Sequence, residues 1–593
     1  MKLILILVFL IYNFILNINC ENVLKVLDVK LAQTHVISIS GKSWNLQNKT
    51  QHMSLIGDRR ALLLASFEDP NQVYYVSVWF DSENKGSLKL NDPSNLPPTE
   101  DNGEKFSTVH HSIMLPREWV MPKMKFHFFS MGQNDTIASD FFYPDINQNY
   151  TLKMWTLPFY LFGANDTNTQ PFSSTMGINT NITSELKERW SCSELIAENH
   201  PIKRIDWPYL VMEPRNGDPA MLITNSDQKK DGYAIMNGVL KILTEIREAF
   251  GESTSSIQIY SPLLQLGANG KYADPYGGLG GGSRGTGDYK YSFTFFHEQG
   301  HAMGLPHAGE AYNAGKYPYV NGSLLGCEWG YDANHNEFLG TFIPPTSDQF
   351  KKCRSHSVFD SKNRCVKQSV MQGGAGDYSS KYRYSMFADF EMTTIQNYFK
   401  DSIYYNEIKK SYVKWNDTSK SYSDYRPATK NNGLWGLDDG TPIERDVDVY
   451  TIIFTYSTVG PSELSQVYPI LKSKGNLMRR FDPTNKTDMV AITPSTGSLP
   501  WYCFASGCDY TVRVTFADDS KEHLVLRQGK RQYWKPTGDF KDNLNNPTSS
   551  DSFVLRGINI KATKIIKKVE LLETLMAWKG ISSNATVLVS KTF

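Results

Sequence analysis

The sequence predicts a multidomain α+β protein in which β-rich regions flank a mixed α/β region. Three observations lead to this prediction. At 593 residues the chain is too long for one hydrophobic core. Apolar segments with strand-like patterns concentrate in residues 21–150 and again in residues 426–593. Helical spacing of apolar residues appears between them, so we expect a β-sandwich over 21–150, a mixed domain over 151–425 and a β-rich domain over 426–593.

Residues 1–20 have the pattern of a secretory signal. Lys2 is followed by an apolar run to Leu16, and small or polar residues then lead to Cys20. A membrane anchor is the alternative, but the run is short for a membrane span and Asn13 interrupts it. We therefore expect cleavage near Cys20 and a secreted, extracellular protein. Loss of Lys2 leaves equal numbers of basic and acidic side chains, so charge indicates neither a nucleic-acid nor a membrane partner.

Six of the seven cysteines remain once Cys20 is removed with the signal. An even number of cysteines in a secreted chain predicts disulfides, and six cysteines allow 15 pairings. Proximity in the sequence and then elimination favour the pairs Cys353–Cys365, Cys503–Cys508 and Cys192–Cys327. A zinc site built from these cysteines is an alternative, but C-x-x-C spacing is missing.

Asparagines in N-x-S/T sequons are spread along the chain and predict a glycoprotein with surface loops in every region. They are Asn48, Asn134, Asn149, Asn165, Asn181, Asn321, Asn416, Asn485 and Asn584.

The N-terminal region reads as strands at 34–40, 61–67, 73–80 and 124–129, with a proline-rich loop at 92–99. A β-sandwich is the simplest arrangement of such strands. Strands are also expected near the C-terminus at 447–456, 510–516 and 523–526, and these predict a second sandwich.

The middle region begins with helical apolar spacing over 236–250, which Gly251 ends, and a short strand follows at 256–260. A glycine tract then covers 277–287. Its residues 280–285 match G-x-G-x-x-G, but the tract does not join a strand directly to a helix and lacks the phosphate-loop Lys-Ser/Thr, so we reject a nucleotide site. Two interpretations stay open: a flexible loop, or a cleft wall that a substrate backbone approaches closely.

The strongest motif is H-E-x-x-H-x-x-G-x-x-H, which begins at His297. His297 and His301 are four residues apart and lie on one face of a helix, so both imidazoles can reach one ion. Gly304 can adopt a left-handed turn that returns His307 as a third ligand. Three protein ligands and a water are typical of a catalytic zinc, and Glu298 is placed to hold that water. A surface helix that carries histidines by chance is the alternative, but aromatic neighbours predict a buried helix.

Three downstream features complete this region. Met371 precedes two glycines and is our candidate for the methionine turn beneath the metal, although an ordinary core methionine is the alternative. Tyr384 is a candidate for stabilising the oxyanion of the reaction. A helix over 389–399 then closes the mixed region.

These residues resemble the dictomallein family of secreted, metzincin-type zinc metalloproteases, which includes the bacterial mucin-cleaving protease StcE. The resemblance extends beyond the motif to residues 115–120, 277–282, 329–332, 370–374 and 413–416. It implies a β-sandwich N-terminal domain, a metzincin-like zinc protease domain and a β-rich C-terminal domain. It also implies one catalytic Zn²⁺ held by His297, His301 and His307, with Glu298 as the catalytic carboxylate.

The hypothesis is a secreted zinc endopeptidase that hydrolyses peptide bonds in proteins or glycoproteins, with mucin-like chains as one option, by a zinc-bound water that Glu298 activates. A secreted glycan- or protein-binding module with a silent zinc site is the alternative, although a silent site has no need of Glu298. Hydrolysis of an ester or amide of a small molecule is a third interpretation, and long flanking domains suit it less than a polymer.

Overall fold

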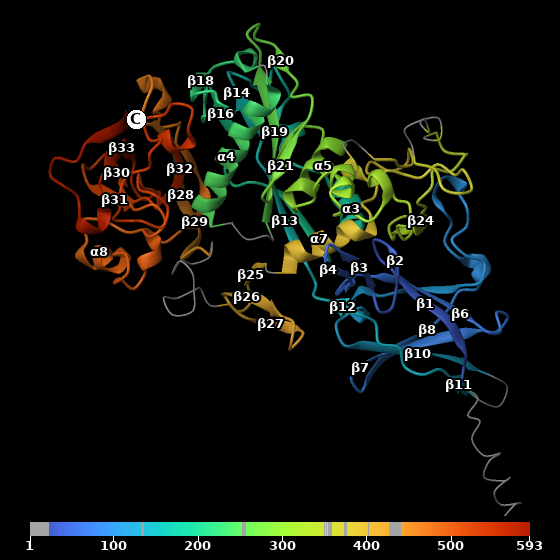
Figure 1. Cartoon of the computed structure of the whole chain (residues 1–593). Helices are drawn as coiled ribbons and strands as arrows, with labels where there is room; N and C mark the ends of the chain where they lie inside the picture. Colours follow the sequence, from blue (N-terminus) through green and yellow to red (C-terminus); the bar gives the residue numbers. More distant parts are fainter. Residues whose placement is uncertain are drawn as a thin grey trace, which may run out of the picture. The chain divides into compact units, whose positions relative to one another are not determined.

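The structure is a computed structural model that describes residues 23–131, 136–229, 231–251, 257–348, 350, 353, 358–372, 376–400, 402–425 and 441–593. It is β-rich with few helices (Figure 1), as predicted for an α+β chain. Within these residues, no helix is both long enough and apolar enough to cross a membrane. The predicted signal at residues 1–20 lies outside the described residues.

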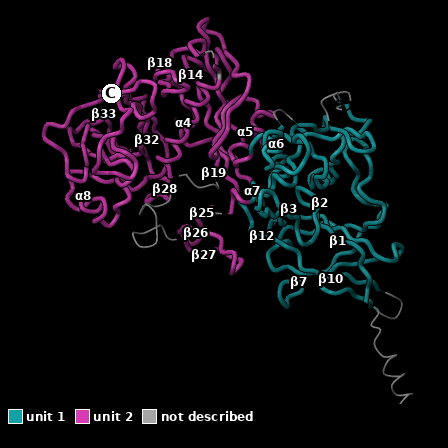
Figure 2. The backbone as a smooth tube through the Cα atoms, viewed as in Figure 1, with its two compact units in different colours: residues 1–151, 184–194, 306–396 teal, residues 152–183, 195–305, 397–593 magenta. Residues whose placement is uncertain are grey.

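The chain forms two compact units, each assembled from separate segments (Figure 2). Unit 1 comprises Met1–Thr151, Ser184–Glu194 and Pro306–Gln396, and unit 2 comprises Leu152–Thr183, Leu195–Leu305 and Asn397–Phe593. The predicted domains follow the linear sequence instead, and their boundaries stay a prediction.

Unit 1 contains two four-stranded antiparallel sheets near its N-terminus. The first sheet has the strand order β2 (Val36–Ser38), β1 (Val26–Ala32), β6 (Ala61–Phe67), β9 (His111–Leu115). The second has the order β11 (Thr136–Ala138), β10 (Met124–Met131), β7 (Tyr74–Phe80), β8 (Glu83–Lys89). All of β6 is buried, whereas β10 alternates between buried and more exposed positions. The ring of Phe67 lies 3.7 Å from that of Tyr74 and 5.3 Å from that of Phe128, centroid to centroid, so the two sheets share an aromatic core. The strands expected at 61–67, 73–80 and 124–129 are therefore present.

The other elements of unit 1 are short, and α3 and α7 each extend into unit 2. They are β3 (Lys42–Leu46), β4 (Lys49–Met53), β5 (Leu55–Ile56), β12 (Ile146–Asn147), α3 (Thr180–Arg189), α6 (Ala308–Asn313), β23 (Gly330–Asp332), β24 (Glu337–Leu339), η7 (Val370–Gln372) and α7 (Asp389–Lys400). The Lys42 ammonium lies 2.7 Å from the Asp389 carboxylate, so the β3–β4 hairpin is tied to the start of α7. Helix α7 is the one expected at 389–399.

The central sheet of unit 2 is mostly parallel. β19 (Ile257–Leu266) pairs in parallel with β13 (Thr151–Thr156), β14 (Phe159–Leu161) and β22 (Arg284–Gly287). The remaining strands are β15 (Glu194–Asn199), β16 (Ile205–Trp207), β20 (Tyr272–Ala273) and β21 (Leu279–Gly281). Nine of the ten residues of β19 are buried, among them the polar Gln258, Ser261 and Gln265, as expected of a strand covered on both faces. The strand predicted at 256–260 is thus longer than expected.

Helix α4 (Gly232–Phe250) packs on this sheet and confirms the helix expected at 236–250. The Asp231 carboxylate accepts a hydrogen bond from the Tyr233 amide, and Gly251 ends the helix in the left-handed conformation at φ 72°. The buried apolar face of α4 contributes Val239, Leu243 and Ile246 to the same core as Ile259 and Leu263 of β19.

The C-terminal part of unit 2 contains two antiparallel sheets with a shared core. One has the order β29 (Leu471–Leu477), β28 (Glu444–Ser457), β32 (Phe553–Lys561), and the other β31 (Lys521–Val525), β30 (Tyr510–Phe516), β33 (Ile566–Glu573), β34 (Val587–Thr592). Ile452 and Phe454 of β28 pack with Val512 and Val514 of β30, which is the packing expected of a sandwich. The hairpin sheet β25 (Ile403–Asn406), β26 (Ser411–Asn416), β27 (Ser421–Asp424) precedes it in the sequence.

The cysteines correct one prediction. Cys353–Cys365 and Cys503–Cys508 form disulfides, as expected, but Cys192 and Cys327 are free and buried, so the third expected pair is wrong. Elimination assumed that every cysteine is paired. Burial instead raises the pKa of the Cys192 thiol to about 11, and the Cys327 sulfur accepts a hydrogen bond from the Asp389 amide at 3.3 Å. Both thiols are held as small buried side chains.

Candidate metal centre

The histidine motif begins on α5 (Phe293–Ala302). Residues within and next to this helix cap its N-terminus and bury it. The Ser292 hydroxyl caps it by accepting a hydrogen bond from the Thr294 amide. Phe295, Phe296 and Ala302 are at most 2% exposed and hold the helix against its neighbours. The expected buried helix is therefore present, and burial extends to His297 and Glu298, which are 8% and 7% exposed.

The glycine tract lies directly against α5. It forms the antiparallel hairpin β21–β22, so the flexible-loop interpretation is wrong. A Cβ atom at Gly280 would lie 2.1 Å from the Glu298 carbonyl oxygen, and one at Gly278 would lie 2.5 Å from the Glu298 Cγ. A Cβ at Gly285 would likewise overlap the Gln299 side chain. The tract thus approaches α5 closely. The approach of a substrate backbone, which the second interpretation expects, stays a prediction.

The turn after α5 brings back the third histidine. Gly304 has φ 90°, in the left-handed region, and the Leu305 amide donates to the Gly300 carbonyl at 3.1 Å. The Leu305 carbonyl oxygen lies 2.7 Å from Nδ1 of His301. Because a carbonyl only accepts, the His301 proton belongs on Nδ1, and Nε2 is the nitrogen that could ligate a metal.

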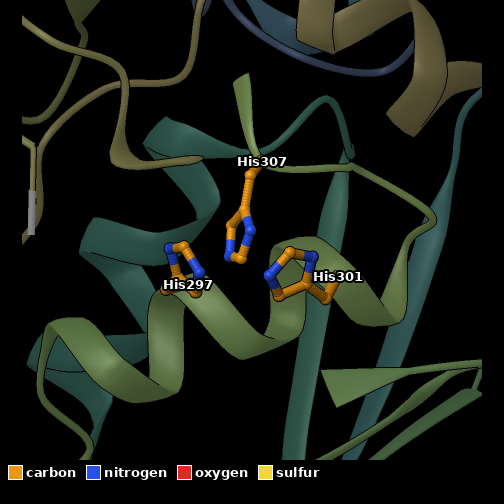
Figure 3. Close-up of side chains that lie close together, drawn as sticks. All are labelled: His297, His301 and His307. Carbon is orange, nitrogen blue, oxygen red and sulfur yellow. The ribbon is translucent and has the colours of Figure 1, made fainter. Parts of the chain in front are cut away.

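His307 precedes α6 and completes the triad. Its carbonyl accepts from the Ala311 amide at 2.9 Å, and its Nδ1 lies 3.5 Å from the Glu310 carboxylate. One ligand nitrogen from each of His297, His301 and His307 lies within 4.8 Å of the others, and Figure 3 shows the three rings pointing toward one another. The ligands of a tetrahedral zinc, each about 2.1 Å from the ion, are roughly 3.4 Å apart, so small side-chain rotations suffice. The donor set fits a single zinc-like ion.

Glu298, the candidate catalytic carboxylate, is buried. Burial raises the pKa of its carboxyl to about 8. A dication bound by the three histidines would lower this pKa again.

The candidate methionine turn adjoins the segment that carries His307, and its place beneath the metal stays a prediction. Met371 is fully buried in η7, and its amide donates to the Ser369 hydroxyl at 3.1 Å. The neighbouring Gln372 side chain fits against Gly309 and Gly322, where an added Cβ would overlap it. The following Gly373 and Gly374 lie outside the described residues.

Tyr384, the candidate for stabilising the oxyanion, is more buried than that role suggests. It is 1% exposed, and its amide donates to the Glu185 carboxylate at 2.9 Å. Its assignment to the oxyanion stays a prediction.

The sequence did not reveal a cavity of about 580 Å³ beside His307. Carboxamides dominate its lining, and the sequence does not mark it because its walls come from separate segments. The lining residues are His307, Gly309, Glu310, Asn313, Asn321, Gln368 and Gln372.

The sequence also did not reveal a buried ion pair that fixes the segment at 329–332. The Arg189 guanidinium lies 2.8 Å from the Asp332 carboxylate, and neither side chain is more than 2% exposed. Burial favours the neutral acid, but Arg189 and hydrogen bonds from His335 lower the pKa of Asp332 below its ordinary value.

Comparison with known proteins places the motif in a wider context. Residues 100–404, which include all three histidines, match the family described as Peptidase M66. The chain is 79% identical to Dictomallein-4 of Dictyostelium discoideum over 99% of this chain and 100% of that protein. It is 71% identical to Dictomallein-3 of the same organism over the full length of both. It is 40% identical to Dictomallein of Burkholderia pseudomallei strain 1710b over 94% of this chain and 82% of that protein.

Proposed function

The chain belongs to the dictomallein family of metalloproteases, Peptidase M66, and from this premise we propose that it is a secreted zinc endopeptidase that cleaves protein or glycoprotein substrates. The observation that carries the proposal is the convergence of three imidazoles beside a buried glutamate. The signal-like residues 1–20, the two disulfides and the sequons support secretion. The parallel sheet of unit 2 with α4 and α5 is the candidate metzincin-like core.

We propose Zn²⁺ as the ion. Nitrogen donors suit zinc, and three of them leave a position open for chemistry, as catalytic sites require. When bound, zinc supplies a Lewis acid that polarises the scissile carbonyl and makes water a stronger acid.

Glu298 performs the proton transfers. Its carboxylate takes a proton from the attacking water and later returns that proton to the leaving amine. The Gly278 backbone packs closely against this side chain, because a Cβ at residue 278 would lie 2.5 Å from the Glu298 Cγ. The same packing limits water around the carboxyl.

The edge strand β21 is suited to hold the substrate backbone. Within the described residues β21 pairs with β22 on one side, and its glycines pass the Glu298 segment of α5. A peptide in extended conformation that adds to β21 through backbone hydrogen bonds would run past the catalytic carboxylate. Such binding uses the backbone of the substrate rather than its side chains, which suits an endopeptidase.

Replacement of Glu298 tests the proposal. Glu298→Ala should retain about one zinc ion per chain and lose at least about 100-fold in casein hydrolysis, because the ligands stay and the proton-transfer group goes. Glu463→Gln, at an exposed position, is the matched control and should cleave like the parent. An undiminished rate in Glu298→Ala would overturn the assignment.

The parent protein decides between the two main hypotheses. Cleavage of casein that a chelator abolishes and zinc restores supports the endopeptidase. Zinc binding without any cleavage of casein or mucin would favour the binding module with a silent site.

A further inference from the structure

The cavity beside His307 contains a glycosylation sequon in its own wall. Asn321-Gly322-Ser323 has the N-x-S pattern, and Asn321 is one of the residues that line the cavity. We propose that Asn321 carries an N-linked glycan whose innermost sugars lie across this cavity and restrict which substrate side chains enter it. The inference deepens the proposed function and rests on its secretory route and its metal site.

The Asn321 amide is available for modification. The residue is exposed at the tip of the 3₁₀ turn η5 (Val320–Gly322), with φ 50°. Within the described part of the chain its carboxamide makes no hydrogen bond. The sequon Asn165 differs, because its Nδ2 donates to the Gly163 carbonyl and its Oδ1 accepts from the Thr167 amide. Attachment of a sugar at Asn321 therefore breaks no contact.

The attachment point is fixed relative to the cavity. The Ser369 amide donates to the Gly322 carbonyl at 3.1 Å, and the Leu324 amide donates to the Lys367 carbonyl at 2.8 Å. The Gln372 side chain fills the space in front of Gly322, where a Cβ would overlap it. The turn is thus anchored on both sides to the segment that carries the methionine turn, so a glycan here starts from a rigid position.

Size and chemistry favour a sugar over the cavity. About 580 Å³ is the volume of a small-ligand site, so the innermost sugars are large enough to fill or cover it. The carboxamides of Asn313, Gln368 and Gln372 offer donors and acceptors that match hydroxyl and acetamido groups. A substrate side chain and the glycan would therefore compete for the same space beside His307.

The test compares full-length protein secreted by a eukaryotic host with the same protein from a bacterial periplasm, which adds no N-glycan. Ser323→Ala removes the sequon while leaving Asn321 in place, and Asn321→Gln removes the attachment atom. Asn584→Gln deletes a sequon that does not line the cavity and is the matched control. Glycopeptide mass spectrometry gives occupancy, and a peptide library gives cleavage rates for small and bulky side chains next to the scissile bond.

The proposal expects Asn321 to be occupied in the eukaryotic product. Ser323→Ala and Asn321→Gln should then each raise kcat/KM for bulky substrates by several-fold in that host, with little change for small ones. Ser323→Ala should change nothing in the bacterial product. An unmodified Asn321 beside an occupied Asn584, or equal effects of Ser323→Ala in both hosts, would overturn the proposal.

Failure of the proposed function would look different. If no sample cleaves any peptide although Asn321 is occupied, the protease proposal fails, and the rate of zinc loss to a bulky chelator decides the inference. A glycan over the cavity should slow that loss several-fold relative to Ser323→Ala from the same host. Equal rates of loss would exclude a glycan across the cavity.

Discussion

Glu391 offers a stability prediction that can be worked out from its surroundings. Its carboxyl is 3% exposed in α7 and accepts hydrogen bonds from the Ser369 hydroxyl at 2.8 Å and the Ala388 amide at 2.6 Å. Burial raises its pKa to about 7, a shift that the nearby Asp389 reinforces and the two hydrogen bonds only partly offset. The perturbation is Glu391→Gln, which keeps an acceptor for both donors and cannot ionise.

The sign follows from the raised pKa. An unfolded glutamate titrates near 4.5, so between pH 4.5 and 7 the folded protein holds a proton that the unfolded chain has lost. The stabilising contribution of this carboxyl is therefore fully present below pH 4.5 and is lost as pH rises through 7. A shift of about 2.5 pKa units corresponds to roughly 3 kcal/mol. Glu391→Gln should not show this loss, so it should gain about 3 kcal/mol over the parent between pH 4.5 and pH 8.

Calorimetric unfolding of parent and variant over this pH range measures the difference, with transitions assigned separately because a chain of this size need not unfold in one step. Glu463→Gln, at an exposed position, is the control and should follow the parent at every pH. Parallel pH profiles for Glu391→Gln and the parent would show that the buried carboxyl does not titrate as argued. A Glu391→Gln variant that becomes less stable relative to the parent as pH rises would refute the sign of the predicted effect.

Three further predictions concern the core, the hairpin and the thiols. Arg189→Met leaves the Asp332 carboxylate buried without its partner and should lower the free energy of unfolding, measured in urea, by about 3–5 kcal/mol. The double variant with Asp332→Leu should recover most of that loss, and a double variant as unstable as Arg189→Met would contradict the prediction. Gly280→Ala should lower the rate of peptide hydrolysis at least about tenfold because its methyl group overlaps α5. Gly277→Ala, which has open space around it, should cleave at nearly the parent's rate, and equal rates for the two variants would contradict the close packing of Gly280 on α5. A thiol assay in denaturant without reductant should count the two free cysteines of the mature chain, and a third would mean that Cys20 is retained.

The histidine triad was predictable because its determinants are local. All three histidines fall within one short stretch, and helix periodicity plus one left-handed glycine are enough to bring them together. The long strands and helix α4 were predictable for the same reason, since their apolar patterns record burial directly. The failed Cys192–Cys327 pair shows the limit: neither residue's sequence neighbourhood reveals whether a partner lies within bonding distance.

The glycine tract shows why substrate-facing features are harder to infer than ligands. Its sequence permits a mobile loop, a phosphate site or a close approach, since glycine only removes a steric restriction and does not say what uses the space. The structure supplies the missing neighbour, because Gly278, Gly280 and Gly285 meet α5 at Glu298 and Gln299. The same holds for the cavity beside His307, whose walls come from segments near residues 310, 321 and 370. Chemistry that depends on one helix can be inferred from one motif, whereas specificity depends on which distant segments the fold brings beside it.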